Sequence, residues 1–237
     1  MSLHVYPDTK EPYFQLPAPF EHFRLTQPRL SDAPFVTTVL NSPKVYPFLA
    51  GPPYPFYEEH SIEFNAKLAI PMREAAWNEI REQVLAGKTD FVAGGAPFST
   101  IREVLPDGSE VYRGGAALIR SLFHEVVDDE ERRKAQEENN AKAAGDPTIV
   151  WAFGFLLDPT QHSRGIMSAV VKSLIYDWAV PHLKAKHLVS TAFFDNIGSQ
   201  KVFLKNGFHF VGSVVPLVDL THKGRTDNTL FVYKLDL

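Results

Sequence analysis

The chain has 237 residues, of which 44% are hydrophobic and 22% are charged, so it can bury a core of ordinary size. The formal net charge of −4 gives no electrostatic reason to expect nucleic acid or an anionic membrane as a partner. The absence of cysteine excludes disulfides, a thiolate nucleophile and a thiolate metal site, and it fits a reducing compartment.

The N-terminal segment contains several prolines and scattered charges. A signal peptide would need an unbroken apolar stretch there, and no part of the chain approaches the roughly twenty apolar residues of a membrane span. We therefore expect a soluble protein of the cytoplasm. Residues 1–20 are predicted to form an extended arm without an element of its own, and residues 21–237 a single domain.

The first part of the domain is predicted to hold one strand and three helical pieces. Residues 21–27 suit a strand, and Ser31 or Asp32 can cap a short helix that ends near Pro43. A loop rich in Pro and Gly follows, and then two helical pieces that are broken around Pro71. The loop carries three aromatic side chains, Tyr54, Phe56 and Tyr57.

Two further segments precede the second half of the chain. Residues 97–104 and 110–121 flank an Asp-Gly pair, which predicts a β-hairpin. Residues 124–147 are nearly all charged or small. They form either an exposed helix or a mobile surface loop, and we favour the loop.

From residue 148 onward, apolar runs of strand length alternate with helical patterns. The expected order is strand 148–157, helix 164–180, strand 186–194, helix 198–206, strand 208–215 and strand 228–236. Such alternation indicates an α/β or α+β sheet with crossover connections.

The helix expected after Gly165 has a broad apolar face and should therefore pack deeply against the sheet, with Pro181 ending it. Its apolar positions are Ile166, Met167, Val170, Val171, Leu174, Ile175, Trp178 and Ala179. The unpaired amides and positive dipole at its start, next to Arg164, suit a pyrophosphate. In the alternative interpretation, Ser163 is a simple N-cap and Gly165 an ordinary turn residue.

Glycine also interrupts the strand that precedes this helix. Gly154 lies in the middle of that strand, where glycine often marks a bulge or a close approach to the backbone. A long ligand could then run along the strand with its phosphates on the following helix.

These segments together resemble the GNAT N-acetyltransferase superfamily, in the branch that is similar to the ribosomal-protein alanine N-acetyltransferases. The family's pyrophosphate motif, Gln/Arg-x-x-Gly-x-Gly/Ala, falls on residues 162–167 with Gly165 as its central glycine, and it departs from the pattern at His162 and Met167. The second motif, Asn-x-x-Ala/Ser before a helix ending in Lys-x-Gly-Phe, matches at Asn196, Ser199, Lys205, Gly207 and Phe208. The resemblance covers roughly residues 21–80 and 148–236.

The resemblance implies an enzyme that transfers an acetyl group from acetyl-CoA to a primary amine, either a peptide N-terminus or a small amine. It implies a GNAT fold with a mixed, roughly seven-stranded sheet whose fourth and fifth strands splay apart around the pantetheine arm of the cofactor. Residues 124–147 would be an insertion before the fourth strand. No metal and no nucleic acid are expected.

The resemblance also implies which residues contact acetyl-CoA. They are Phe155, Leu156, Leu157, His162, Arg164, Gly165, Ile166, Met167, Ser168, Asn196, Ser199 and Phe203. Many relatives place a tyrosine as general acid where this chain has Phe203, which cannot donate a proton, so Ser199 is the expected catalytic acid. Relatives often carry a glutamate base where this chain has Ala152. His162, Asp195 or a chain of waters could serve as the base.

Two other functions stay open. The departures at Ala152, His162, Met167 and Phe203 would also suit a protein of this fold that binds an acyl-CoA without catalysis. The proline-rich N-terminus and the charged segment would suit a scaffold that binds other proteins.

Overall fold

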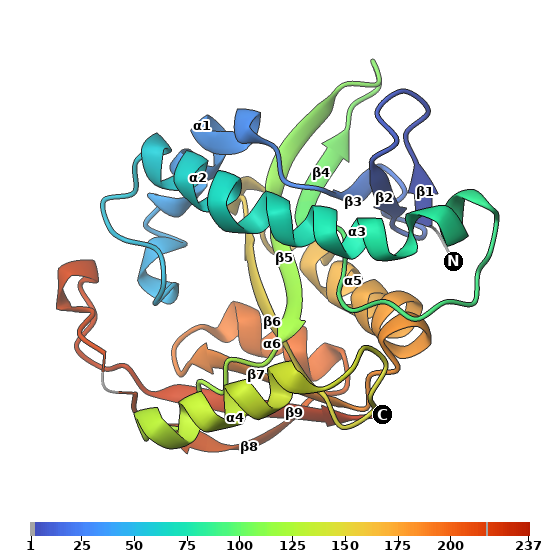
Figure 1. Cartoon of the computed structure of the whole chain (residues 1–237). Helices are drawn as coiled ribbons and strands as arrows, with labels where there is room; N and C mark the ends of the chain where they lie inside the picture. The colour runs from blue at the N-terminus through green and yellow to red at the C-terminus, as the bar shows by residue number, and fades with distance from the viewer. Residues whose placement is uncertain (1–2, 217) are drawn as a thin grey trace.

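The computed structural model describes residues 3–216 and 218–237, which form an α+β fold built on one mixed sheet (Figure 1). Within these described residues, the sheet has nine strands in the order β1-β2-β3-β4-β5-β6-β7-β9-β8, and only the pair β6–β7 is parallel. The strands are β1 Leu3–Val5, β2 Pro12–Gln15, β3 Phe23–Thr26, β4 Thr100–Val104, β5 Glu110–Arg120, β6 Val150–Leu157, β7 His187–Phe193, β8 His209–Val214 and β9 Leu230–Asp236.

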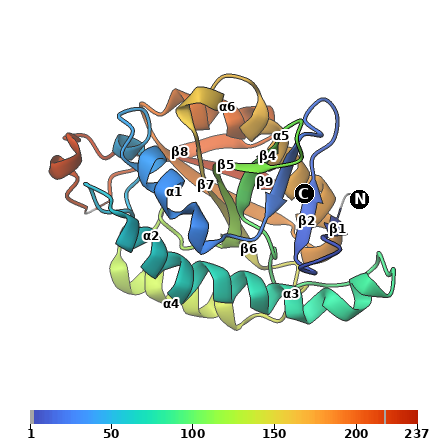
Figure 2. The ribbon, with the colours of Figure 1, turned by 90° about the horizontal axis from the view of Figure 1, so that it is seen from above.

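Helices cover both faces of this sheet. They are α1 Ala33–Leu40, α2 Glu58–Phe64, α3 Ile70–Leu85, α4 Asp129–Ala141, α5 Ile166–Ser173 and α6 Ile197–Lys205. Helices α1, α2, α3 and α4 lie on one face, and α5 and α6 lie on the other (Figure 2). No helix among the described residues is long and apolar enough to span a membrane.

The N-terminal residues extend the sheet, so the prediction of an arm without secondary structure is wrong. Strands β1 and β2 form an antiparallel hairpin that pairs with β3, which adds two strands to the roughly seven expected. Phe14 of β2 is buried in the main core, and the Tyr6 hydroxyl donates a hydrogen bond to Glu110 at the start of β5. Packing on the sheet thus orders a segment whose composition carries little strand signal.

The charged segment 124–147 contains helix α4, so the prediction of a loop is also wrong. The Asp128 carboxylate caps the helix by accepting a hydrogen bond from the Glu131 amide at 2.9 Å. Near its end, the buried Asn139 side chain both donates to the Val150 carbonyl and accepts from the Val150 amide, each at 2.9 Å. Polar contacts therefore fix a helix that has almost no apolar face.

The expected helix after Gly165 is present and is longer than predicted. Helix α5 continues as a π-helical segment, Leu174–Leu183, which includes Pro181 rather than ending there. The eight apolar positions expected on its face are all buried. Between α2 and α3, a second π-helical segment, Asn65–Ala69, leads into Pro71 without a break in the helix.

The predicted hairpin and the remaining strands of the second half agree with the structure. Residues 105–109 connect β4 to β5, and the β6-α5-β7-α6-β8-β9 order follows the expected alternation. Asp32 precedes α1 as predicted, but its side chain does not cap that helix. Its carboxylate instead forms a buried bidentate ion pair with Arg102 on β4, at 2.8 Å for both contacts.

Candidate active site

The two parallel strands at the centre of the sheet separate soon after they begin. β6 and β7 pair only at Val150–His187 and Trp151–Leu188. Two residues further along, the Phe153 amide donates to the Ser190 side-chain hydroxyl at 3.1 Å instead of to a backbone carbonyl. The strands therefore splay, as the resemblance predicted, and Ser190 lies where the gap begins.

The backbone of β6 presents unpaired groups to this gap. Bonds from the Ser121 amide to the Val150 carbonyl and from the Asp158 amide to the Arg113 carbonyl show that even-numbered residues of β6 bond to β5. The amides of Phe155 and Leu157 consequently point toward the gap. No backbone acceptor for either amide is described in residues 3–216 or 218–237.

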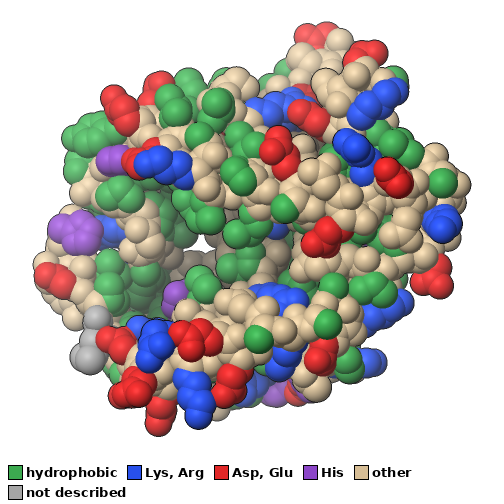
Figure 3. Space-filling view, viewed as in Figure 1, with side chains coloured by type: hydrophobic (Ala, Val, Ile, Leu, Met, Phe, Trp, Pro, Cys, Tyr) green, Lys and Arg blue, Asp and Glu red, His purple; other side chains and the backbone are tan. Residues whose placement is uncertain are grey.

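Gly154 occupies a regular position in the β5–β6 ladder, so it marks no bulge there. A Cβ atom at this position would meet no other atom within 4 Å, so open space lies above the strand. Figure 3 shows a hollow on this side of the molecule, between the α1–α3 half and α4, with apolar side chains on its walls. A ligand therefore has room to approach the backbone closely at Gly154, as the glycine in this strand suggested.

An exposed turn connects β6 to α5. Residues 162–165 are exposed, and Gly165 adopts a left-handed conformation with φ of 84° as the N-cap of α5. The first helical bond runs from the Ala169 amide to the Gly165 carbonyl, which leaves the amides of residues 166–168 without acceptors in the helix. The turn thus has the free amides and positive dipole that an anion requires.

Side chains of this turn contact the protein without covering the helix start. The His162 Nε2 donates to the Leu157 carbonyl at 2.9 Å, and Arg164 donates to the Gln161 side chain. The nearest outside atom to a Cβ at Gly165 would be the Phe20 Cζ, at 3.6 Å, which is an ordinary contact distance. Ile166 and Met167 are buried as whole residues, at 1% and 7% exposed, so their side chains do not contact a ligand at the surface of the turn.

The second predicted site motif lies across the gap, between β7 and α6. The Asn196 Oδ1 accepts from the Ser199 amide at 3.1 Å and so caps α6. Ser199 is partly exposed, and no hydrogen bond of its hydroxyl is described in residues 3–216 and 218–237. The amide nitrogen of Asn196 and the hydroxyl of Ser199 therefore remain available to a ligand.

Phe203 does not support its predicted contact with the cofactor. Its side chain is 1% exposed and packs in the core, with ring centroids 5.4 Å from those of Phe155, Phe208 and Tyr233. Leu156 turns to the α1 face and packs against the cluster that contains Tyr112. A cofactor in the gap would contact Leu156 and Leu157 through their backbone.

The candidate bases differ in how strongly they are engaged. Asp195 forms a bidentate ion pair with Arg225, at 2.9 and 3.2 Å, so both of its carboxylate oxygens are engaged with the guanidinium. Because the His162 Nε2 donates to a carbonyl, the Nδ1 atom is the nitrogen that could accept one. Asp195 is therefore a poor candidate, and His162 or water remains.

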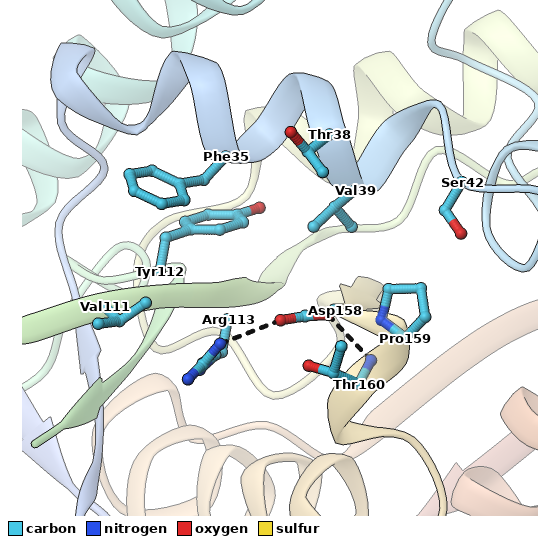
Figure 4. A pocket seen from close by; sticks show the side chains of 10 residues that line it. All are labelled: Phe35, Thr38, Val39, Ser42, Val111, Tyr112, Arg113, Asp158, Pro159 and Thr160. Atoms are coloured by element: carbon cyan, nitrogen blue, oxygen red, sulfur yellow. Dashed lines mark hydrogen bonds and ion pairs between the residues drawn. The ribbon is translucent and has the colours of Figure 1, made fainter.

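A cavity of about 330 Å³ lies on the α1 face beside the turn (Figure 4). Asp158 and Thr160 from the end of β6 line it together with residues of α1 and β5, and Arg113 forms an ion pair with Asp158 at 3.2 Å. Burial raises the pKa of Tyr112 above its ordinary value, so its hydroxyl keeps its proton. That hydroxyl lies against the cavity, and it can donate a hydrogen bond there.

Several residues that shape this site were not predicted from the sequence. Ser190 and Arg225 have no local signal, because their partners lie 37 and 30 residues away along the chain. Asp158 did have one, since an Asp-Pro pair directly after a strand is a common start for a turn. Its carboxylate caps the short 3-10 turn that follows by accepting from the Thr160 amide at 2.9 Å.

A known protein family and solved structures are similar to this chain. Residues 126–209 match the family model of the acetyltransferase (GNAT) domain, and this range contains the turn at Gly165 and the motif at Asn196. The chain has the GNAT acetyltransferase fold. The match begins within segment 124–147, so α4 lies inside the matched range. No significant match to a curated protein sequence is found.

Solved GNAT structures share the fold over nearly the whole chain. A GNAT-family acetyltransferase from Bacillus anthracis gives a TM-score of 0.57 at 12% identity, covering 91% of this chain and 95% of its own. The microcin self-immunity acetyltransferase MccE, in complex with acetyl-CoA and AMP, gives 0.53 at 14% identity, covering 92% and 93%. The ribosomal alpha-N-protein acetyltransferase RimL, in complex with coenzyme A, gives 0.53 at 13% identity, covering 91% and 94%.

Proposed function

We propose that this GNAT-fold chain transfers the acetyl group of acetyl-CoA to a primary amine, by direct attack of the amine in a ternary complex. The observation that carries the proposal is the gap between β6 and β7, which starts at Ser190 and leads to the exposed helix start at Gly165. Relatives of the same fold have been solved with acetyl-CoA or coenzyme A. Acetyl-CoA supplies the activated thioester.

The residues of the turn would hold the pyrophosphate of the cofactor. The amides of Ile166, Met167 and Ser168 would donate to its oxygens, and the Arg164 guanidinium would add positive charge. The pantetheine arm would lie in the gap, where the Leu157 amide and the Asn196 side chain can donate to its carbonyl groups.

Two groups on opposite sides of the gap would promote the reaction. The Phe155 amide would donate to the thioester oxygen as negative charge develops on it. The Ser199 hydroxyl would give a proton to the departing thiolate and would regain one, through water, from the amine as the amide bond forms and the C–S bond breaks. Phe155 lies on β6 and Ser199 on α6, so the reacting carbonyl would sit between them.

The acceptor would approach from the α1 face, through the hollow above Gly154. The cavity beside Asp158 opens on the same face and supplies the Tyr112 hydroxyl for a more distant part of the acceptor. The amine must be neutral to attack, which favours an α-amine with a pKa of about 8 over a lysine side chain near 10.4. We therefore propose a peptide N-terminus or a small amine of low basicity.

Titration calorimetry with coenzyme A, followed by transfer of radiolabelled acetyl groups to a panel of peptides and polyamines, tests the proposal. Binding together with transfer supports the enzyme. Binding without transfer to any amine would favour the non-catalytic acyl-CoA-binding alternative. Absence of binding would refute the placement of the cofactor and leave the scaffold alternative.

A further inference from the structure

The loop between β8 and β9 carries a buried cation that holds the loop between α1 and α2. Lys223 is 3% exposed, and its ammonium donates to the carbonyls of Leu49, at 2.5 Å, and Pro52. Burial lowers the pKa of Lys223 below its ordinary value. Within the described residues no carboxylate contacts this ammonium, so backbone carbonyls alone hold the charge. The two loops are therefore joined by an interaction that is costly to bury.

Arg225 follows two residues further along and contacts residues on both sides of the gap. One side is the segment after β7, and the other is the α1–α2 loop. Its guanidinium forms the bidentate ion pair with Asp195, just beyond the end of β7, and stacks 3.9 Å from the centre of the Phe193 ring. The same guanidinium donates to the Pro47 carbonyl in the α1–α2 loop at 3.3 Å. The Arg225 side chain is 5% exposed, so the guanidinium itself is buried, whereas the Asp195 carboxylate is 44% exposed.

The α1–α2 loop belongs to the β6 half of the molecule. Val45 at its start packs in one cluster with Tyr112 of β5, and β5 pairs with β6 along its length. Asp195 belongs to the other half, because it follows β7. Figures 1 and 2 show the two loops side by side at one end of the molecule.

The position of these contacts matters because hydrogen bonds between β6 and β7 cease near Ser190. Beyond that point the strand ladder no longer sets the distance between the halves. Both strands run in the same direction from their two shared pairs, so Asp195 lies at the open end of the gap. Arg225 therefore joins the halves at the end that lacks a ladder.

We propose that Arg225 is a positioning residue that fixes the width of the gap at its open end. That width also sets the separation of the Phe155 amide and the Ser199 hydroxyl, one on each side of the gap. The effect on acetyl transfer rests on the proposed function, whereas the effect on width does not. Each part can therefore be tested separately.

A distance measurement tests the width directly. The chain has no cysteine, so spin labels can be attached at Lys44→Cys in the α1–α2 loop and Lys201→Cys on α6, both exposed positions. We expect a single narrow distance distribution by double electron–electron resonance. Arg225→Lys keeps a cation near Phe193 but cannot bind Asp195 and Pro47 together, so the distribution should broaden or shift. Arg133→Lys, at an exposed ion pair with Glu137, is the control and should change nothing.

Kinetics test the consequence for the reaction. Arg225→Lys should lower kcat by about ten-fold or more, because small misplacements of reacting groups are costly. Asp195→Asn, which keeps the shape of the side chain, should act in the same direction and serves if Arg225→Lys folds poorly. Unchanged spin-label distances in both variants would overturn the proposal, as would a kcat equal to that of the parent. If the parent neither binds coenzyme A nor transfers acetyl groups, the proposed function fails while the distances still decide the role of Arg225.

Discussion

Gly165 combines a backbone conformation and an exposure that suit an anion. Its φ of 84° lies in the left-handed region, which asparagine and aspartate tolerate better than other residues with side chains. Gly165→Asp and Gly165→Asn should therefore strain the turn equally, while only aspartate adds negative charge at the helix start.

We expect Gly165→Asp to abolish coenzyme A binding in titration calorimetry without unfolding the protein, as judged by circular dichroism. Gly165→Asn should retain measurable binding and serves as the matched control. Normal binding by the aspartate variant would contradict the placement of the pyrophosphate at this turn.

Ser199 should affect the chemical step more than cofactor binding. Ser199→Ala removes the proposed proton donor to the thiolate, so kcat should fall by about a hundred-fold while the KM for acetyl-CoA changes little. Ser199→Thr keeps a hydroxyl and should recover part of the rate. Equal kinetics of the alanine variant and the parent, measured by thiol release, would show that Ser199 is not the acid.

The residues at the turn could be predicted because they are contiguous in the sequence. A strand, a polar turn, Gly165 and an apolar helix follow each other within residues 148–180, so local pattern alone locates the helix start. Phe203 shows the limit of this reasoning. It occupies a motif position, but whether its side chain faces the gap or the core depends on the packing of Phe155 and Tyr233, which no local pattern reveals.

At the scale of single elements, α4 depends on one polar contact more than on apolar packing. Asn139 is 2% exposed and satisfies both the amide and the carbonyl of Val150 at the start of β6. Asn139→Ala leaves the Val150 amide without a partner in a partly buried place, while the Val150 carbonyl keeps only its bond from the Ser121 amide. We expect a loss of about 2 kcal/mol in the free energy of unfolding, measured by urea denaturation.

Asn140→Ala is the matched control for this prediction. Asn140 is the next residue, is exposed, and lies in the same turn of α4, so its loss should change stability by less than about 0.5 kcal/mol. A similar loss in both variants would mean that helix propensity, rather than the contact with Val150, accounts for the effect.

Helix α4 escaped prediction for a physical reason. A helical pattern is recognised by its apolar stripe, and the residues from Asp129 to Ala141 have almost none. The contacts that order it, from Asn139 to Val150 and from Gln136 to the Leu122 carbonyl at 2.7 Å, join segments that sequence pattern cannot align. The periodic helix α5, by contrast, was predicted from its stripe alone.

For the whole molecule, cofactor binding should appear as added stability. A ligand at 100 times its Kd contributes about 2.7 kcal/mol, which in a protein of this size raises the melting temperature by roughly 5 to 11 °C. We expect a dose-dependent shift with coenzyme A in differential scanning fluorimetry. The Gly165→Asp variant should show no shift, and a parent protein that shows none would argue against a binding site in the gap.

The succession of strands along the chain could be predicted from β3 onward, whereas their order in the sheet and the pairing of the first two strands could not. β1 and β2 are three and four residues long and are flanked by Pro7 and Pro17, so neither shows a strand pattern of useful length. Tertiary contacts hold these two strands in place, namely the burial of Phe14 and the hydrogen bond from Tyr6 to Glu110. The same holds for Lys223 and Arg225, whose main partners are distant in the sequence.

The N-terminal hairpin also changes which edge strands of the sheet can pair with another chain. An open strand edge offers unpaired amides and carbonyls to any extended peptide, and the hazard grows with its length. Because β1 has only three residues, it is an edge strand that offers a poor template for aggregation. The opposite edge strand, β8, is longer, with six residues, and it has Phe210 exposed. A shortened protein that starts after residue 20 would uncover β3 and so present two such edge strands to its neighbours.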